Sequence, residues 1–138
     1  MCRLLPFWRP VIQRIGCEVG IVHVVRHPLA VARSLLRRNG LSLAHGFALW
    51  LDHVERQFGE TDPAWPFIVV EYDRMLAAPL HELGRISAAL RLPLLSRTTA
   101  LFAGVGVQPD LRHEVAESDA GLPPRVMAMW REMQALAG

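Results

Sequence analysis

Two short runs of β-branched residues, separated by a long stretch of helical pattern, limit the possible folds of this chain more than any other feature. Residues 21–25 read Ile-Val-His-Val-Val, and residues 67–71 read Phe-Ile-Val-Val-Glu. Such runs are typical of buried strands. Parallel strands need a crossover connection, usually through a helix, so the helical stretch between the runs favours parallel pairing. We therefore predict a helix-rich α/β fold with a parallel sheet flanked by helices.

Helical patterns account for most of the remaining chain. The segment from His27-Pro28 to Asn39-Gly40 is predicted to be a helix, and Ser42 is expected to cap the next one. That second helix has the most regular apolar face of the chain, formed by Leu43, Phe47, Trp50, Leu51, Val54 and Phe58. The aligned tryptophans at positions 50 and 130 are interpreted as core residues, because their neighbours at helical spacing are mostly apolar.

Shorter helices are expected elsewhere. A first short helix is predicted within Pro6–Ile15, with Gly16 as its stop. Its regular part is expected to begin at Pro10, because proline disrupts a helix interior. Asp73 is expected to cap a turn. Later helices are predicted over residues 80–90 and 96–102, and a final one from Pro123-Pro124.

Two strands of this apolar kind make an unusually thin sheet. Parallel strands are normally covered on both faces and flanked by further strands. Few residues precede Ile21, so we expect residues 1–138 to be one domain that forms the carboxyl-terminal part of a larger α/β domain. The strands that pair with residues 21–25 would come from the missing part. The alternative sources are a second copy or a partner chain, which predicts self-association or a heteromeric sheet.

Composition excludes several classes of function. All 15 basic residues are arginine, so the chain has neither the lysine of a GxxxxGK[ST] phosphate loop nor one for Schiff-base chemistry. A net charge of +2 does not favour nucleic-acid binding. No apolar run reaches the roughly 18 residues of a membrane span. Two cysteines are too few for a disulfide framework, which predicts a cytoplasmic protein.

A metal site is not expected. The spacing of His23 and His27 suits zinc only on a helix, whereas here they span a strand end, where four residues cover roughly 13 Å. We interpret His27 as a residue that shapes the turn after the strand rather than one that moves protons.

Arg26 is the strongest candidate for a binding residue. It follows the first strand, and ligands bind at the carboxyl edge of open α/β sheets. Ser34 lies eight residues later, about two helical turns on. A guanidinium and a hydroxyl in these places can hold one phosphate from two sides. The alternative interpretation is a surface arginine and a solvated serine.

The segment Val24-Val25-Arg26-His27-Pro28-Leu29-Ala30-Val31-Ala32-Arg33-Ser34 resembles the 3′-phosphate-binding motif of sulfotransferases that use 3′-phosphoadenosine 5′-phosphosulfate (PAPS). In that family a strand is followed by an arginine, an Asn/Asp/His-Pro step, a helix and a serine eight residues after the arginine. The later segment Glu71-Tyr72-Asp73-Arg74-Met75-Leu76 is similar to the family's tyrosine-containing turn. The resemblance covers residues 20–92.

This resemblance implies a Rossmann-like fold related to the P-loop proteins, and transfer of a sulfonate group from PAPS to a hydroxyl or amine acceptor. Arg26 and Ser34 would hold the 3′-phosphate, and no metal would be needed. The family's 5′-phosphosulfate loop and catalytic base precede the motif, and nothing before Ile21 matches them, so no catalytic residue is assigned. The alternative function is a non-catalytic α/β interaction module.

Overall fold

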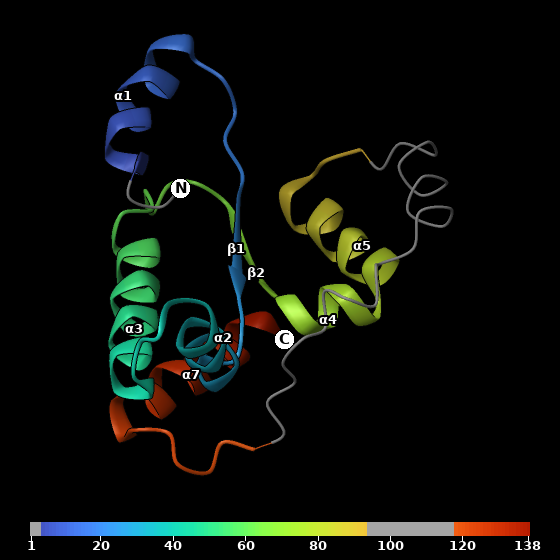
Figure 1. The fold of residues 1–138 in the computed structure, drawn as a ribbon. Coiled ribbons are helices and arrows are strands. Elements are labelled where there is room, and N and C mark those ends of the chain that lie inside the picture. The colour runs from blue at the N-terminus through green and yellow to red at the C-terminus, as the bar shows by residue number, and fades with distance from the viewer. Residues whose placement is uncertain (1–3, 94–117) are drawn as a thin grey trace.

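The structure, a computed structural model, describes residues 4–93 and 118–138. In this part of the chain six helices surround a two-stranded sheet (Figure 1). The elements are α1 (Leu5–Ile15), β1 (Ile21–Val25), α2 (Pro28–Asn39), α3 (Leu43–Gly59), β2 (Phe67–Glu71), α4 (Tyr72–Ala77), α5 (Pro79–Leu90) and α7 (Pro124–Ala137). The helix predicted over residues 96–102 lies outside the described residues.

The sheet is parallel, as predicted, and both strands have the predicted bounds. Its register pairs Ile21 with Phe67 at one end and Val25 with Glu71 at the other. The amide of Ile21 donates to the carbonyl of Pro66 over 2.9 Å, just before the first register pair. The coarse prediction of a helix-rich α/β fold with a parallel sheet is therefore confirmed for the described residues.

Helices lie on both sides of the sheet. In Figure 1, α3 and α5 stand on opposite sides of the two strands. Val25 and Val69 face the side of α3 and α7 and belong to the main core cluster. Successive side chains in a strand point to opposite faces, so Ile68 and Val70 face the other way, and α5 contacts β2 there.

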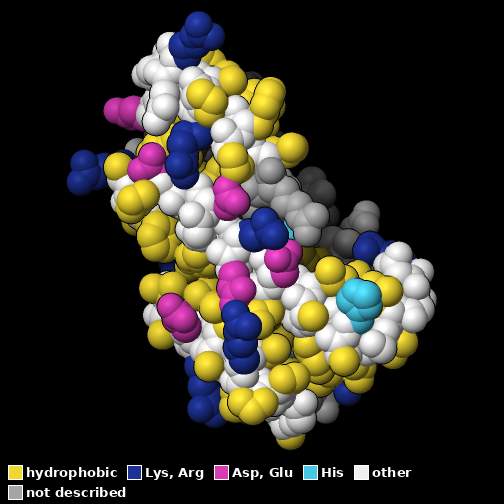
Figure 2. Space-filling model, turned by 90° about the vertical axis from the view of Figure 1, so that its left-hand side faces the viewer, with side chains coloured by type: hydrophobic (Ala, Val, Ile, Leu, Met, Phe, Trp, Pro, Cys, Tyr) yellow, Lys and Arg dark blue, Asp and Glu magenta, His cyan; other side chains and the backbone are white. Residues whose placement is uncertain are grey.

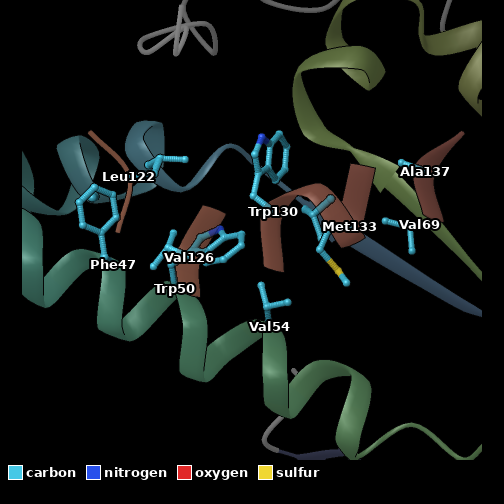
Figure 3. Close-up of a cluster of buried hydrophobic side chains, with 11 residues drawn as sticks. Phe47, Trp50, Val54, Val69, Leu122, Val126, Trp130, Met133 and Ala137 are labelled. Carbon is cyan, nitrogen blue, oxygen red and sulfur yellow. The ribbon is translucent and has the colours of Figure 1, made fainter. Parts of the chain in front are cut away.

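The core is built mainly where α3 meets α7. Figure 3 shows the side chains of the two helices facing one another: Phe47, Trp50 and Val54 from α3, and Val126, Trp130 and Met133 from α7. The two indole rings meet edge to face with centroids 6.5 Å apart. Both tryptophans are buried, which confirms their prediction as core residues.

A buried ion cluster joins α4 and α5 to the end of α7. Glu82 on α5 is only 1% exposed, yet its carboxylate contacts Arg74 at 3.2 Å and is hydrogen-bonded to Arg85. The two arginines also donate to the backbone carbonyl of Ala137. Burial opposes ionisation of Glu82, but the hydrogen bonds from Arg85 and His81 and the charges of both arginines keep its pKa below the usual value.

Two local predictions were wrong. Helix α1 begins at Leu5 and contains Pro10, because the fixed φ of proline is itself helical and the cost is confined to one backbone hydrogen bond and one crowded carbonyl. Asp73 lies in the first turn of α4 rather than capping it; Glu71 holds the cap position. The predicted end of α1 at Gly16 is confirmed by its left-handed φ of 68°.

One side of the molecule is less well covered. Strand β1 pairs only with β2 among the described residues, and Val22 and Val24 are 38% and 52% exposed. Helix α1 also exposes large apolar side chains, including those of Phe7 and Ile15. Figure 2 shows hydrophobic side chains reaching the surface between charged ones on the side where α1 and α3 lie. No helix in the described ranges is long and apolar enough to cross a membrane.

Candidate functional site

The carboxyl ends of the two strands bring together residues that are far apart in the chain. Since Val25 pairs with Glu71, Arg26 emerges beside Tyr72 and Asp73. The guanidinium carbon of Arg26 lies 4.7 Å from the centre of the Tyr72 ring, a cation–π contact. Arg26 Nη2 lies 3.5 Å from Asp73 Oδ1. This edge of the sheet is where open α/β folds bind ligands.

A cavity of about 380 Å³ opens at this edge. It is lined from β1 and its turn by Val25, Arg26 and His27, from β2 and α4 by Glu71, Tyr72 and Asp73, and from the later chain by Ser118, Asp119, Trp130 and Gln134. Its polar lining combines one guanidinium with three carboxyl groups, an imidazole, a phenol, a hydroxyl and an amide. Such a lining offers both an anion contact, at Arg26, and several hydrogen-bond acceptors.

His27 closes the turn between β1 and α2. Its Nδ1 accepts a hydrogen bond from the amide of Leu29 over 3.2 Å, so the ring caps α2. The neutral ring then carries its proton on Nε2, which donates to Asp119 Oδ1 over 3.0 Å. The ring of His27 thus shapes the turn after β1, as predicted.

The backbone of Arg26 is held by the core beneath it. Trp50 Nε1 donates to the Arg26 carbonyl over 3.0 Å, from α3 to the end of β1. Trp50 is itself buried against Trp130, which also lines the cavity. The position of the candidate binding residue therefore depends on a core side chain.

Ser34, the second predicted binding residue, is placed differently. It is half-buried on α2, and neither of the two cavities that Arg26 lines includes it. The prediction that Arg26 and Ser34 hold one phosphate stays a prediction.

A second polar cluster lies around the middle of β1. His23 is buried between the rings of Phe58 and Phe67. Its Nδ1 lies 2.8 Å from the Gln57 amide nitrogen, and its Nε2 lies 3.3 Å from the Thr61 hydroxyl. Burial lowers the pKa of His23. These contacts explain His23 as a neutral structural residue.

Metal binding finds no support in the described ranges. No group of three or more histidine, cysteine, aspartate or glutamate side chains there has an arrangement that could hold a metal ion. His23 and His27 make separate contacts, with Gln57 and Asp119 respectively.

Sequence reasoning missed two contributors to this site. Asp73 was expected only as a cap, although the meeting of parallel carboxyl ends at one edge could have placed it beside Arg26. Asp119 pairs with His27 across 92 residues of sequence, and no pattern indicates that contact.

Comparison of the chain with protein-family models, with curated proteins and with solved structures finds no match.

Proposed function

We propose that this chain is a sulfotransferase-family protein that retains the 3′-phosphate half of a PAPS site, within a Rossmann-like, P-loop-related fold. Arg26 and Ser34 bind the 3′-phosphate of the nucleotide, and the transferred sulfonate goes to a hydroxyl or amine acceptor. The observation that carries this proposal is the position of Arg26 at the carboxyl end of a parallel strand, beside a cavity and one residue before the cap of α2.

The chemistry of the position supports an anionic ligand. Arginine presents a planar fork of donors that suits phosphate, and its charge is permanent at physiological pH. Two contacts hold this arginine: its guanidinium lies over the Tyr72 ring, and its backbone carbonyl accepts a hydrogen bond from Trp50.

The test is a calorimetric titration of the purified chain with adenosine 3′,5′-bisphosphate (PAP), with AMP as the ligand that lacks a 3′-phosphate. We expect PAP to bind more tightly than AMP, and Arg26→Ala to remove that preference. Arg125→Ala is the matched control, because Arg125 is exposed, pairs with Glu55 and does not line the cavity. Equal affinities for PAP and AMP, or no binding by a folded sample, would contradict the proposal.

Ser34→Ala gives a second, independent readout. We expect it to weaken PAP binding and to leave AMP binding unchanged. A Ser34→Ala variant with unchanged PAP affinity would restrict the phosphate contact to Arg26.

The second candidate function is a non-catalytic interaction module completed by a partner chain or a second copy. The open edge of β1 favours it, because Val22 and Val24 are exposed and residues 20–25 carry neither a charged side chain nor proline to protect that edge. In that case light scattering finds a species larger than the monomer, and Val24→Lys returns it to the monomer. A monodisperse wild-type monomer would contradict self-association.

A further inference from the structure

The carboxylate of Asp73 occupies the contact that an anionic ligand would need. Asp73 lies two residues after the end of β2 and pairs with Arg26 Nη2, while the guanidinium lies over the ring of Tyr72. A phosphate bound at Arg26 would meet a site that already holds one negative partner. Asp119 also lines the cavity, but its carboxylate pairs with His27.

The geometry of this ion pair indicates that a phosphate group can replace Asp73 as the partner of Arg26. Its 3.5 Å separation is well beyond the roughly 2.7–2.9 Å of a charge-assisted N–H···O bond. The side chains of Arg26 and Asp73 are 20% and 38% exposed, so water reaches both partners. A phosphate oxygen at normal distance from Arg26 would form the shorter and stronger bond.

We propose that Asp73 is a positioning residue that competes with the ligand: it holds Arg26 against Tyr72 in the empty site and is displaced when a phosphate group binds. This inference rests on the proposed function. It makes Asp73 a determinant of affinity, because each binding event must first break its contact with Arg26. Removal of the carboxylate takes away the contact that a bound phosphate would have to displace.

The experiment compares three single substitutions that each remove one negative charge. Asp73→Asn removes the competing carboxylate. Glu71→Gln removes a carboxylate that lines the same cavity, and Asp52→Asn removes one that pairs with Arg56 on the surface of α3. Calorimetry with PAP and with AMP gives the affinities, and thermal unfolding shows that each variant is folded.

We expect Asp73→Asn to tighten PAP binding roughly two- to fivefold, the range for loss of one exposed ion pair. Glu71→Gln should have a smaller effect, and Asp52→Asn should leave the affinity unchanged. A folded Asp73→Asn variant that binds PAP no better than Glu71→Gln or Asp52→Asn overturns the inference.

The outcome also separates this inference from the proposed function. Selective PAP binding with no gain in Asp73→Asn overturns the inference alone. A gain in Asp73→Asn that is equal for PAP and AMP supports the competition but contradicts the 3′-phosphate site. Absence of binding in both the wild type and Asp73→Asn overturns both.

Discussion

Strands β1 and β2 have the same length, pair in register and are both rich in β-branched residues, yet their environments differ. Val24 and Val70 are register partners; Val24 is 52% exposed and Val70 is fully buried. Strand β2 packs against α4, α5 and α7, whereas the main partner of β1 among the described residues is β2 itself. The burial of a strand is therefore decided by the elements around it, and two paired strands of similar sequence can differ in how far helices cover them.

The difference also affects the candidate site. Arg26 follows the less covered strand, and its contacts Tyr72 and Asp73 lie in α4, directly after the buried one. The well-packed side of the sheet thus supplies the groups that hold the candidate binding residue of the less covered side. Five predictions test or refine this contrast, in order of decreasing expected effect.

The largest effect on stability is expected from the buried ion cluster around Glu82, on the β2 side of the molecule. Glu82→Ala leaves Arg74 and Arg85 without their buried carboxylate and should lower the free energy of unfolding by about 3–5 kcal/mol. Glu55→Ala, which breaks an exposed pair with Arg125, should cost less than about 1 kcal/mol. Urea denaturation measures both, and a similar loss in the two variants would contradict the role of the cluster.

The same cluster predicts that the protein loses stability in acid. The pKa of Glu82 is lower in the folded chain than its usual value of 4.5, so its ionised form stabilises the fold above that pH. The stabilisation is lost as the pH falls below 4.5 toward the folded-state pKa. Glu82→Ala should flatten this part of the stability profile, and Glu55→Ala should not.

The next largest effect on stability is expected at the contact between α2 and α3, on the β1 side. A Cβ at Gly46 of α3 would lie 2.8 Å from both the Cα and the Cβ of Ala32 on α2. Gly46→Ala should therefore force the two helices apart and destabilise the protein by about 1–3 kcal/mol. Gly84→Ala on α5 meets no atom within 4 Å and should instead stabilise it, by up to about 1 kcal/mol. Thermal unfolding of the two variants tests this prediction. A change in unfolding temperature of the same sign in both would contradict the close approach of α2 and α3.

The fourth prediction compares the two strands directly. Val70→Ala removes buried methyl groups and should cost about 1–2 kcal/mol. Val24→Ala, at its register partner, should cost at most about 0.5 kcal/mol, because the side chain is largely exposed. Equal losses in urea denaturation would show that the β1 edge is covered in solution, which would favour the interaction-module alternative.

The smallest effect is expected from His23, on the covered face of β1. Its folded-state pKa is lowered from 6.5 by burial, so the unfolded chain binds the proton more readily. Stability should be highest above pH 6.5 and should fall as the pH drops from there toward the folded-state pKa. His23→Gln should lose this dependence, while His53→Gln, at an exposed position, should retain it. A wild-type profile that is flat between pH 7.5 and 5 would contradict this assignment.

Local patterns in the sequence predicted much of the fold. Both strands and the start and end of α2 followed from β-branched runs, from Pro28 and from Gly40, whose left-handed φ of 68° ends the helix. Ser42 caps α3 as expected, its hydroxyl accepting from the amide of His45. These features depend on residues within one or two turns of each other, which is why they can be read from sequence.

The candidate site was less predictable because it depends on contacts between distant segments. Arg26 was identified from its place after a strand, but its contacts with Trp50 and Asp73 require the register and the packing of α3. The burial of Glu82 also gave no local signal. Arg85 lies one turn away on α5, but Arg74 comes from α4, and the carboxylate is buried only because α4, α5 and the end of α7 pack together.

The hydrogen bond from Trp50 to the Arg26 carbonyl has a consequence for how this chain can change in evolution. Position 50 serves the interior and the ligand edge at once, since one indole fills the core and its N–H orients the end of β1. Phenylalanine would preserve most of the packing but would leave that carbonyl without its donor. Natural selection for binding at Arg26 would therefore also act on this interior residue, and fewer substitutions should be tolerated at position 50 than packing alone would allow.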